Sequence, residues 1–295
     1  MSFSADVKNE LCKIRPSGCC KIAECYGILL FSRAFSKQSV SLITEHEEVA
    51  NRLSELLRIL CGVSVKLQAH GSIRDFYSVS VEDVKDRLKI LEFFGHSHDE
   101  ISPRINKNNL MKDCCEGAFI RGAFLAAGSI TNPQKDYHVE FLTSHKSLAD
   151  DMVELLSNRG FTPRITKRGA TSVIYFKESN NIEDLLTIMN ATGYTLELMN
   201  IKIYKNVRNK INRLTNCETA NIAKTVNAAI KQQEAIRILE ESGKLQQLSR
   251  ELIEAAELRK NNPDMSLSEL SKLCGLTRSG LNHRLRKLIK LAGLE

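Results

Sequence analysis

The sequence lacks any hydrophobic run long enough to cross a membrane, and it has no apolar segment typical of a secretion signal. Its longest uninterrupted stretches of apolar residues and glycine are Cys25 to Phe31 and Gly122 to Gly128. A membrane-spanning helix needs roughly 20 such residues. The N-terminal residues MSFSADVKNELCKI carry charges where a signal peptide has its apolar core. These absences predict a cytoplasmic protein with no membrane partner.

The CxxC spacing of structural zinc sites is also missing, although the chain contains nine cysteines. Their odd number favours buried thiols in a reducing compartment over a disulfide framework. Two adjacent pairs, Cys19-Cys20 and Cys114-Cys115, stand out. Neighbouring side chains on a helix point about 100° apart, so we expect that these four do not all line one site. They are predicted to pack at a helix interface, with no metal and no cofactor.

Positive charge is distributed unevenly along the chain. Residues 1 to 204 carry 25 Lys and Arg against 25 Asp and Glu, whereas residues 205 to 295 carry 17 against 10. The whole net charge of +7 therefore belongs to the last third. Cationic side chains release condensed counterions from nucleic-acid phosphates. The asymmetry predicts a polyanion as the partner of that segment.

An internal repeat organises the first two hundred residues. At an offset of 95 residues, Cys19-Cys20 aligns with Cys114-Cys115 and Gly27 aligns with Gly122. At an offset of 99, VSLIT from Val40 aligns with VEFLT from Val139. Each copy reads helix, strand, strand, helix, strand, strand, helix, from its apolar spacing and turn residues. We predict a duplicated α+β domain with antiparallel sheets.

That order resembles the monomeric LAGLIDADG homing endonucleases over about residues 19 to 195. The resemblance lies in the opening helices, CYGILLFSRAF from Cys25 and IRGAFLAAGSI from Ile120. In that family two such helices pack at a pseudo-twofold axis, which implies small residues at the contact. Gly122, Ala126 and Gly128 fit this requirement, and the first copy offers Gly27.

Catalysis in that family implies an acidic residue near the end of each opening helix, where the paired carboxylates hold divalent metals. Ser32 and Ala127 stand at these positions. Neither a hydroxyl nor a methyl replaces a carboxylate as a Mg²⁺ ligand. The nearest acids, Glu24 and Glu116, lie two turns or more away. The sequence therefore predicts a scaffold without nuclease activity, while a nuclease that uses another acid remains the alternative.

A basic segment follows the repeats. No acidic residue occurs between Glu197 and Glu218, and apolar residues recur at helical spacing from Ile203 to Leu214. We expect a docked helix whose outer face contacts phosphate, and a merely solvated face is the alternative. The candidate DNA contacts here are Lys202, Lys205, Arg208, Lys210 and Arg213.

A helix-turn-helix is predicted near the C-terminus. Ser266 to Glu269 fits a capping box, a turn follows at Cys274-Gly275-Leu276, and a second helix begins at Thr277. Leu281, Leu285 and Leu288 would face the core. Arg284 departs from the usual apolar pattern, and an ordinary helical hairpin is the alternative. The candidate DNA contacts on the second helix are Thr277, Arg278, Ser279, Asn282, His283, Arg286, Lys287 and Lys290.

Three features together resemble the WhiA family: the degenerate duplication, the stretch RLTNCETANIAKTVNAAIKQ from Arg213, and the motif LTRSGLNHRLRKL from Leu276. The resemblance implies a non-enzymatic, sequence-specific transcription regulator linked to cell division, chromosome segregation or sporulation. It also implies association with double-stranded DNA in the nucleoid. A division-associated scaffold, and contacts with transcription or division proteins, stay open. The expected domains are a LAGLIDADG-like domain over 1–200 with repeats at about 19–96 and 114–195, a basic linker over 201–230 and a helix-turn-helix domain over 231–295.

Overall fold

The computed structural model describes residues 2–16, 18–71, 75–98, 100 and 102–294. The chain divides into two compact units, residues 1–204 and 205–295. Each unit has its own cluster of buried apolar side chains. Among the described residues, no helix is both long and apolar enough to cross a membrane.

The first unit contains the same run of elements twice, preceded by one extra helix, α1 (Phe3–Lys13). The first copy comprises α2 (Gly18–Leu30), β1 (Ala34–Phe35), β2 (Val40–Thr44), α3 (Glu47–Cys61), β3 (Lys66–His70), β4 (Phe76–Ser80) and α4 (Val84–Phe93). A short 3-10 turn, η1 (Lys107–Leu110), leads to the second copy. This copy comprises α5 (Asp113–Ala127), β5 (Gly128–Ile130), β6 (Val139–Thr143), α6 (Lys146–Asn158), β7 (Arg164–Arg168), β8 (Thr171–Phe176) and α7 (Ser179–Ile188).

Each copy forms one four-stranded antiparallel sheet, and the two sheets share one topology. Their strand orders are β1-β2-β4-β3 and β5-β6-β8-β7. Alternate residues of β6, Val139, Phe141 and Thr143, are buried, because successive side chains of a strand point to opposite faces. Helices α3 and α6 pack on their respective sheets. The predicted fold class, a duplicated α+β domain followed by an all-α helix-turn-helix region, is confirmed.

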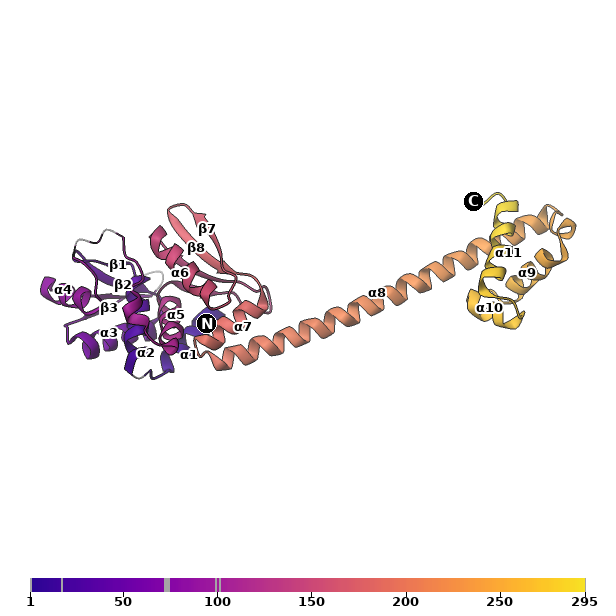
Figure 1. Ribbon diagram of the computed structural model, residues 1–295. Coiled ribbons are helices and arrows are strands. Elements are labelled where there is room, and N and C mark those ends of the chain that lie inside the picture. Colours follow the sequence, from indigo (N-terminus) through magenta and orange to yellow (C-terminus); the bar gives the residue numbers. More distant parts are fainter. Residues whose placement is uncertain (1, 17, 72–74, 99, 101, 295) are drawn as a thin grey trace. The chain divides into compact units, whose positions relative to one another are not determined.

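Helices α2 and α5 lie side by side and join the two copies (Figure 1). A Cβ atom on Gly122 would lie 2.1 Å from the Glu24 carbonyl oxygen, and one on Gly27 would lie 2.2 Å from the Phe119 carbonyl oxygen. Glu24 and Phe119 are themselves equivalent at the offset of 95 residues. The two contacts are therefore equivalent in the two copies. The small residues at these positions had predicted this close packing of the helices.

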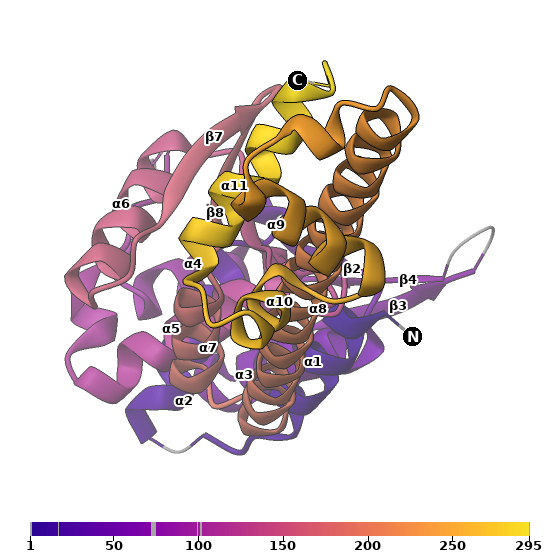
Figure 2. The same ribbon diagram turned by 90° about the vertical axis from the view of Figure 1, so that its right-hand side faces the viewer.

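The second unit is helical. Helix α8 (Thr192–Glu241) contains the boundary between the units, and it is followed by η2 (Leu245–Gln247), α9 (Arg250–Asn261), α10 (Leu267–Leu273) and α11 (Arg278–Leu291). Figure 2 shows α9, α10 and α11 packed around one another. Their shared core contains Ile236, Leu239, Leu245, Leu252, Ala255, Ala256, Leu270, Leu281, Leu285 and Leu288.

The substitution Gly122→Ala tests the close approach of α2 and α5. Its methyl group would meet backbone atoms, which cannot rotate away, so the two helices must separate. We expect the free energy of unfolding to fall by about 2 kcal/mol or more, despite the higher helix propensity of alanine. Gly169→Ala is the control, because open space surrounds this glycine, and only the strain of an L-residue at its φ of +62° costs about 1 kcal/mol. Equal stability of Gly122→Ala and the parent in chemical denaturation would contradict this packing.

Candidate nucleic-acid interface

The predicted start signals of α10 and α11 are both present as hydrogen bonds. The Glu269 backbone N–H donates to Ser266 Oγ at 3.3 Å, and the Ser266 N–H donates to Glu269 Oε2 at 2.8 Å, which completes the capping box. Gly275, with a φ of +67°, turns the chain between the helices. The Gly280 N–H then donates to Thr277 Oγ1 at 3.1 Å. These contacts fix where each helix begins.

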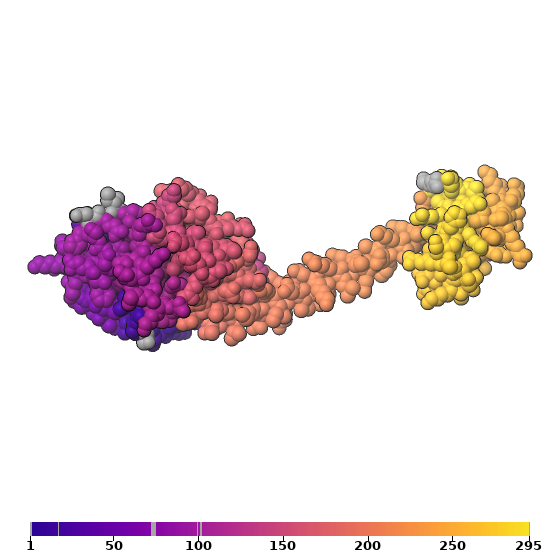
Figure 3. Space-filling view, in the orientation of Figure 1, coloured from indigo at the N-terminus to yellow at the C-terminus, as the bar shows by residue number. Residues whose placement is uncertain are grey.

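Helix α11 has one buried and one exposed face. Leu281, Leu285 and Leu288 are buried as predicted, and Arg284 is partly buried with its guanidinium 3.4 Å from a Glu251 carboxylate oxygen. Figure 3 shows the last residues of the chain, in yellow, at the surface of their unit. Of the predicted contacts, Asn282 is half-buried, and the exposed ones are Thr277, Arg278, Ser279, His283, Arg286, Lys287 and Lys290. Their role in DNA binding stays a prediction.

A polar groove of about 680 Å³ lies beside the first turn of α11. Arg278, Ser279 and Asn282 line one side, and the remaining lining residues are Lys224, Thr225, Ala228, Gln232, Arg259, Ser266, Leu267 and Ser268. The first turn of a helix offers unpaired backbone N–H groups to anions. The groove therefore combines cationic side chains with a helix N-terminus, a combination suited to phosphate.

Two buried polar atoms of this groove have no hydrogen-bond partner among the described residues, Gln232 Oε1 and Arg259 Nε. Buried polar groups are normally satisfied by protein, water or ligand. The other end of the Arg259 guanidinium holds the loop before α10, since Nη1 donates to the Met265 carbonyl at 2.7 Å. Burial also lowers the pKa of Arg259. Arg259 therefore holds the loop beside the groove in place, and it is not part of the exposed edge of the groove.

Lys224 and Gln232 were not predicted as functional residues. A signal was present, because Lys224, Ala228 and Gln232 recur every fourth residue and therefore share one face of α8. All three lie in the stretch from Arg213 to Gln232 that carries the resemblance to the WhiA family.

The predicted basic segment lies within α8, and its cations have different environments. Lys202 Nζ lies 2.5 Å from Asn180 Oδ1 and 3.0 Å from Glu183 Oε1, so this ammonium is held by α7. Arg208, Lys210 and Arg213 are exposed, and Lys205 is partly buried. Lys202 is therefore poorly placed for phosphate, whereas the three exposed cations remain candidates.

The expectation of a docked helix over this segment is wrong for the described structure. Ile203 and Leu214 are each 60% exposed, and Val207 and Ile211 are more than half exposed. Helical spacing of apolar residues predicts an apolar stripe on one face of the helix. It does not predict whether another helix or strand packs on that stripe. The segment is accordingly an uncovered helix with cationic residues on it.

In the first unit, Ala127 is the last residue of α5, and Ser32 lies two residues beyond the end of α2. Their role as former catalytic positions stays a prediction. The Ser32 hydroxyl is 2.6 Å from the Leu29 carbonyl oxygen and 3.2 Å from that of Ala34. Ala127 is a partly buried apolar residue of the core. Neither position offers a carboxylate, so this pair of residues provides no charged oxygen ligand for a catalytic metal.

The alternative acids are committed to ion pairs. Glu24 is fully buried, with Oε1 2.6 Å from Arg52 Nε and Oε2 2.6 Å from Arg121 Nη2. Glu116 accepts a hydrogen bond from Arg159. A carboxylate that two guanidinium groups enclose is a poor metal ligand because the cations repel the metal ion.

The same guanidinium groups cap other helices. Arg52 Nη2 donates to the Ile14 carbonyl at 2.8 Å, and Arg121 Nη1 donates to the Met189 carbonyl at 3.2 Å. Ile14 and Met189 are the C-terminal caps of α1 and α7. Cations are favourable at helix C-termini. The Glu24 cluster is therefore structural, and it ties together α1, α2, α3, α5 and α7.

Comparison with known proteins gives two family matches. The model of the WhiA LAGLIDADG-like domain matches residues 116–208, and that of the WhiA C-terminal HTH domain matches residues 211–292. A probable cell division protein WhiA of Desulforamulus reducens is 38% identical, with 99% of this chain and 95% of that protein covered. Its counterpart from Ruminiclostridium cellulolyticum is also 38% identical, with 99% and 97% covered. The full-length WhiA crystal structure from Thermatoga maritima shares the fold, with a TM-score of 0.63, 22% identity and coverage of 99% and 98%.

Two adjacent residues of α11 test which face of this helix is buried. Leu285→Ala should lower the free energy of unfolding of the second unit by about 2 to 5 kcal/mol, the usual cost of truncating a buried leucine. Arg286→Ala is the matched control and should leave stability nearly unchanged, because the side chain is exposed. Thermal unfolding followed by circular dichroism measures both. The opposite order of stabilities would show that the register of α11 is wrong.

Proposed function

The chain belongs to the WhiA family, and from that premise we propose that it is a sequence-specific DNA-binding regulator without nuclease activity. The observation that carries the proposal is the exposed face of α11 beside the polar groove. Side chains near the start of a recognition helix reach base edges in the major groove of DNA, while cations farther along contact phosphates. Ser279 and His283 fit the first role, and Lys287 and Lys290 fit the second.

Three further observations support double-stranded DNA as the partner. The excess positive charge belongs to residues 205–295, and Lys224 and Arg278 line the groove at the first turn of α11. Exposed Arg208, Lys210 and Arg213 extend the cationic surface along α8. Phosphate contacts fix position on the duplex, and base contacts specify sequence. We assign Lys224 and Arg278 of the groove to phosphate and Arg286 to a base edge.

The two relatives named as probable cell division proteins support a role in cell division, exerted on genes in the nucleoid. A scaffold protein whose DNA contact is incidental is the competing function. It differs in one measurable respect, because a scaffold needs no preferred DNA sequence. The proposed domain roles are a LAGLIDADG-like body over 1–200, a basic linker over 201–230 and a helix-turn-helix reader over 231–295.

Arg286→Ala should weaken binding of the full-length protein to its preferred duplex by about 1 to 3 kcal/mol, the usual value of a good base contact. The preferred duplex is first selected from a random pool with the parent protein. Lys224→Ala should weaken binding to all duplexes alike and reduce the salt dependence by about one phosphate contact. Fluorescence anisotropy over a salt series measures both variants.

The control for this experiment is Arg250→Ala, which removes another exposed cation of the second unit, one that pairs with Glu254 on α9. We expect its DNA affinity to match that of the parent. If Arg250→Ala and Arg286→Ala weaken binding equally, only the total charge matters. If no preferred duplex emerges from selection, the scaffold function is favoured instead.

Duplex DNA should stay intact when the full-length protein is incubated with Mg²⁺ or Mn²⁺, because Ser32 and Ala127 supply no carboxylate and Glu24 is enclosed by Arg52 and Arg121. Gel electrophoresis of plasmid and linear substrates measures cleavage. Glu116→Gln is the informative variant, since Glu116 is the more accessible acid. Metal-dependent cleavage that co-elutes with the protein and disappears in this variant would falsify the proposed absence of nuclease activity.

A further inference from the structure

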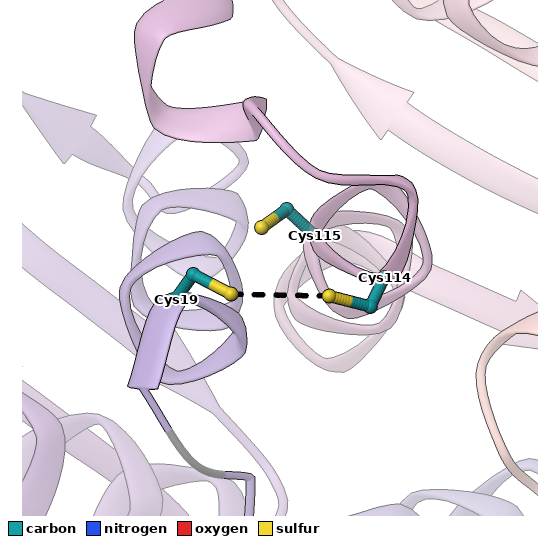
Figure 4. A group of neighbouring side chains, drawn as sticks. All are labelled: Cys19, Cys114 and Cys115. Carbon is teal, nitrogen blue, oxygen red and sulfur yellow. Dashed lines mark hydrogen bonds between the residues drawn. The ribbon is translucent and has the colours of Figure 1, made fainter.

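Three cysteine sulfurs meet where helices α2 and α5 begin. Cys19 is the second residue of α2, and Cys114 and Cys115 are the second and third residues of α5. Their Sγ atoms all lie within 4.8 Å of one another, and those of Cys19 and Cys114 are 3.8 Å apart. Figure 4 shows the sulfurs of Cys19 and Cys114 pointing at each other across the two helices, with that of Cys115 directed into the same space.

As expected, the four cysteines do not all line one site, but three of them converge, which the sequence did not predict. Neighbours on one helix do diverge, but the parallel packing of α2 and α5 places a sulfur from the other helix between them. Cys20 behaves as expected, because its thiol turns to the Cys114 carbonyl oxygen at 3.5 Å. The sequence alone does not reveal which three sulfurs converge.

The spacing of these sulfurs matches a tetrahedral thiolate site. Zinc–sulfur bonds are about 2.3 Å long, so two sulfurs on one tetrahedral zinc ion are separated by about 3.8 Å. The observed separation of Cys19 and Cys114 is 3.8 Å. The third sulfur needs a shift of an ångström at most, since no separation exceeds 4.8 Å. Small rotations about the side-chain bonds of Cys115 supply such a shift.

The electrostatic environment also favours a thiolate at Cys19. All three cysteines lie in the first turn of a helix, where the helix dipole and unpaired N–H groups stabilise negative charge. Hydrogen bonds from Cys115 and Cys114 lower the pKa of the Cys19 thiol, and the nearby Lys112 ammonium adds to this effect. Burial, followed by the interaction with Cys19, raises the pKa of Cys115 to about 11.

We propose that Cys19, Cys114 and Cys115 bind one soft divalent cation of the zinc class, which links the two repeats at the N-terminal ends of α2 and α5. Full coordination replaces three S–H bonds by three metal–sulfur bonds and releases up to three protons to the solvent. Hard cations such as Mg²⁺ prefer oxygen ligands and are excluded. Cys114 is exposed and Cys19 partly so, so the fourth coordination position faces solvent and accepts water or an external donor.

This site is independent of DNA binding. It lies in the first unit, at the opposite ends of α2 and α5 from Ser32 and Ala127. A metal there restrains the pair of helices that joins the repeats. Failure of the metal site would therefore leave the proposed DNA-binding function untouched, and failure of DNA binding would leave the site untouched.

The test uses full-length protein, reduced and freed of metal, titrated with Co²⁺ under anaerobic conditions. We expect sulfur-to-cobalt charge-transfer absorption together with the visible bands of a tetrahedral ion, saturating at one equivalent. Zn²⁺ should abolish these bands at one equivalent, and excess Mg²⁺ should not. Because binding releases protons, the apparent affinity should increase as the pH rises.

The variants Cys19→Ser and Cys114→Ser should each lower the cobalt affinity about tenfold or more, since even residues that only support a ligand affect metal affinity by about 10- to 100-fold. Both side chains are at least partly exposed, so unfolding without metal should match that of the parent. Cys217→Ser and Cys274→Ser are matched controls with exposed cysteines elsewhere, and they should bind like the parent. The proposal is overturned if no thiolate bands appear, or if the bands survive in both ligand variants. A disulfide between Cys19 and Cys114 that persists after treatment with a reductant would also overturn it.

Discussion

The approach of two helix backbones at Gly27 and Gly122 is the constraint on which the first unit depends. At about 2 Å from a neighbouring carbonyl oxygen, no side-chain atom fits at either position. This contact brings the two repeats together in parallel, so that equivalent residues of α2 and α5 face each other. The proximity of Cys19 to Cys114 and of Glu24 to Arg121 both follow from it. Close packing of this kind tolerates little change in volume.

Acidic side chains are distributed unevenly along the paired helices of the first unit. Ser32 and Ala127 leave the C-terminal ends of α2 and α5 without a carboxylate, while Glu24 supplies a carboxylate in the interior. A buried ion pair contributes little to stability overall, but removing one partner is strongly destabilising. Glu24 with its two arginines therefore fixes which helix ends meet.

Sequence alone predicted those features that local pattern determines. The capping box at Ser266, the turn at Gly275 and the buried face of α11 follow from hydrogen bonding and periodicity within a few residues. The paired glycines followed from internal alignment. Contacts between distant segments could not be predicted from the sequence. Examples are the ion pair of Lys202 with Glu183 and the convergence of three cysteines. The apolar stripe of α8 misled because its spacing is the same whether or not another element covers it.

The Glu24 cluster also breaks the symmetry of the repeat. Phe119 is the equivalent of Glu24 in the second copy, and Tyr26 is the equivalent of Arg121 in the first copy. In a homodimer with an isologous interface, every contact occurs twice. Two copies of Glu24 would then crowd one interface and require twice the arginines. A gene duplication that joins the copies in one chain removes that requirement, because each half mutates separately. The single-chain architecture thus permits a charge cluster that occurs only once, at an axis where a dimer of identical subunits would be forced to repeat it.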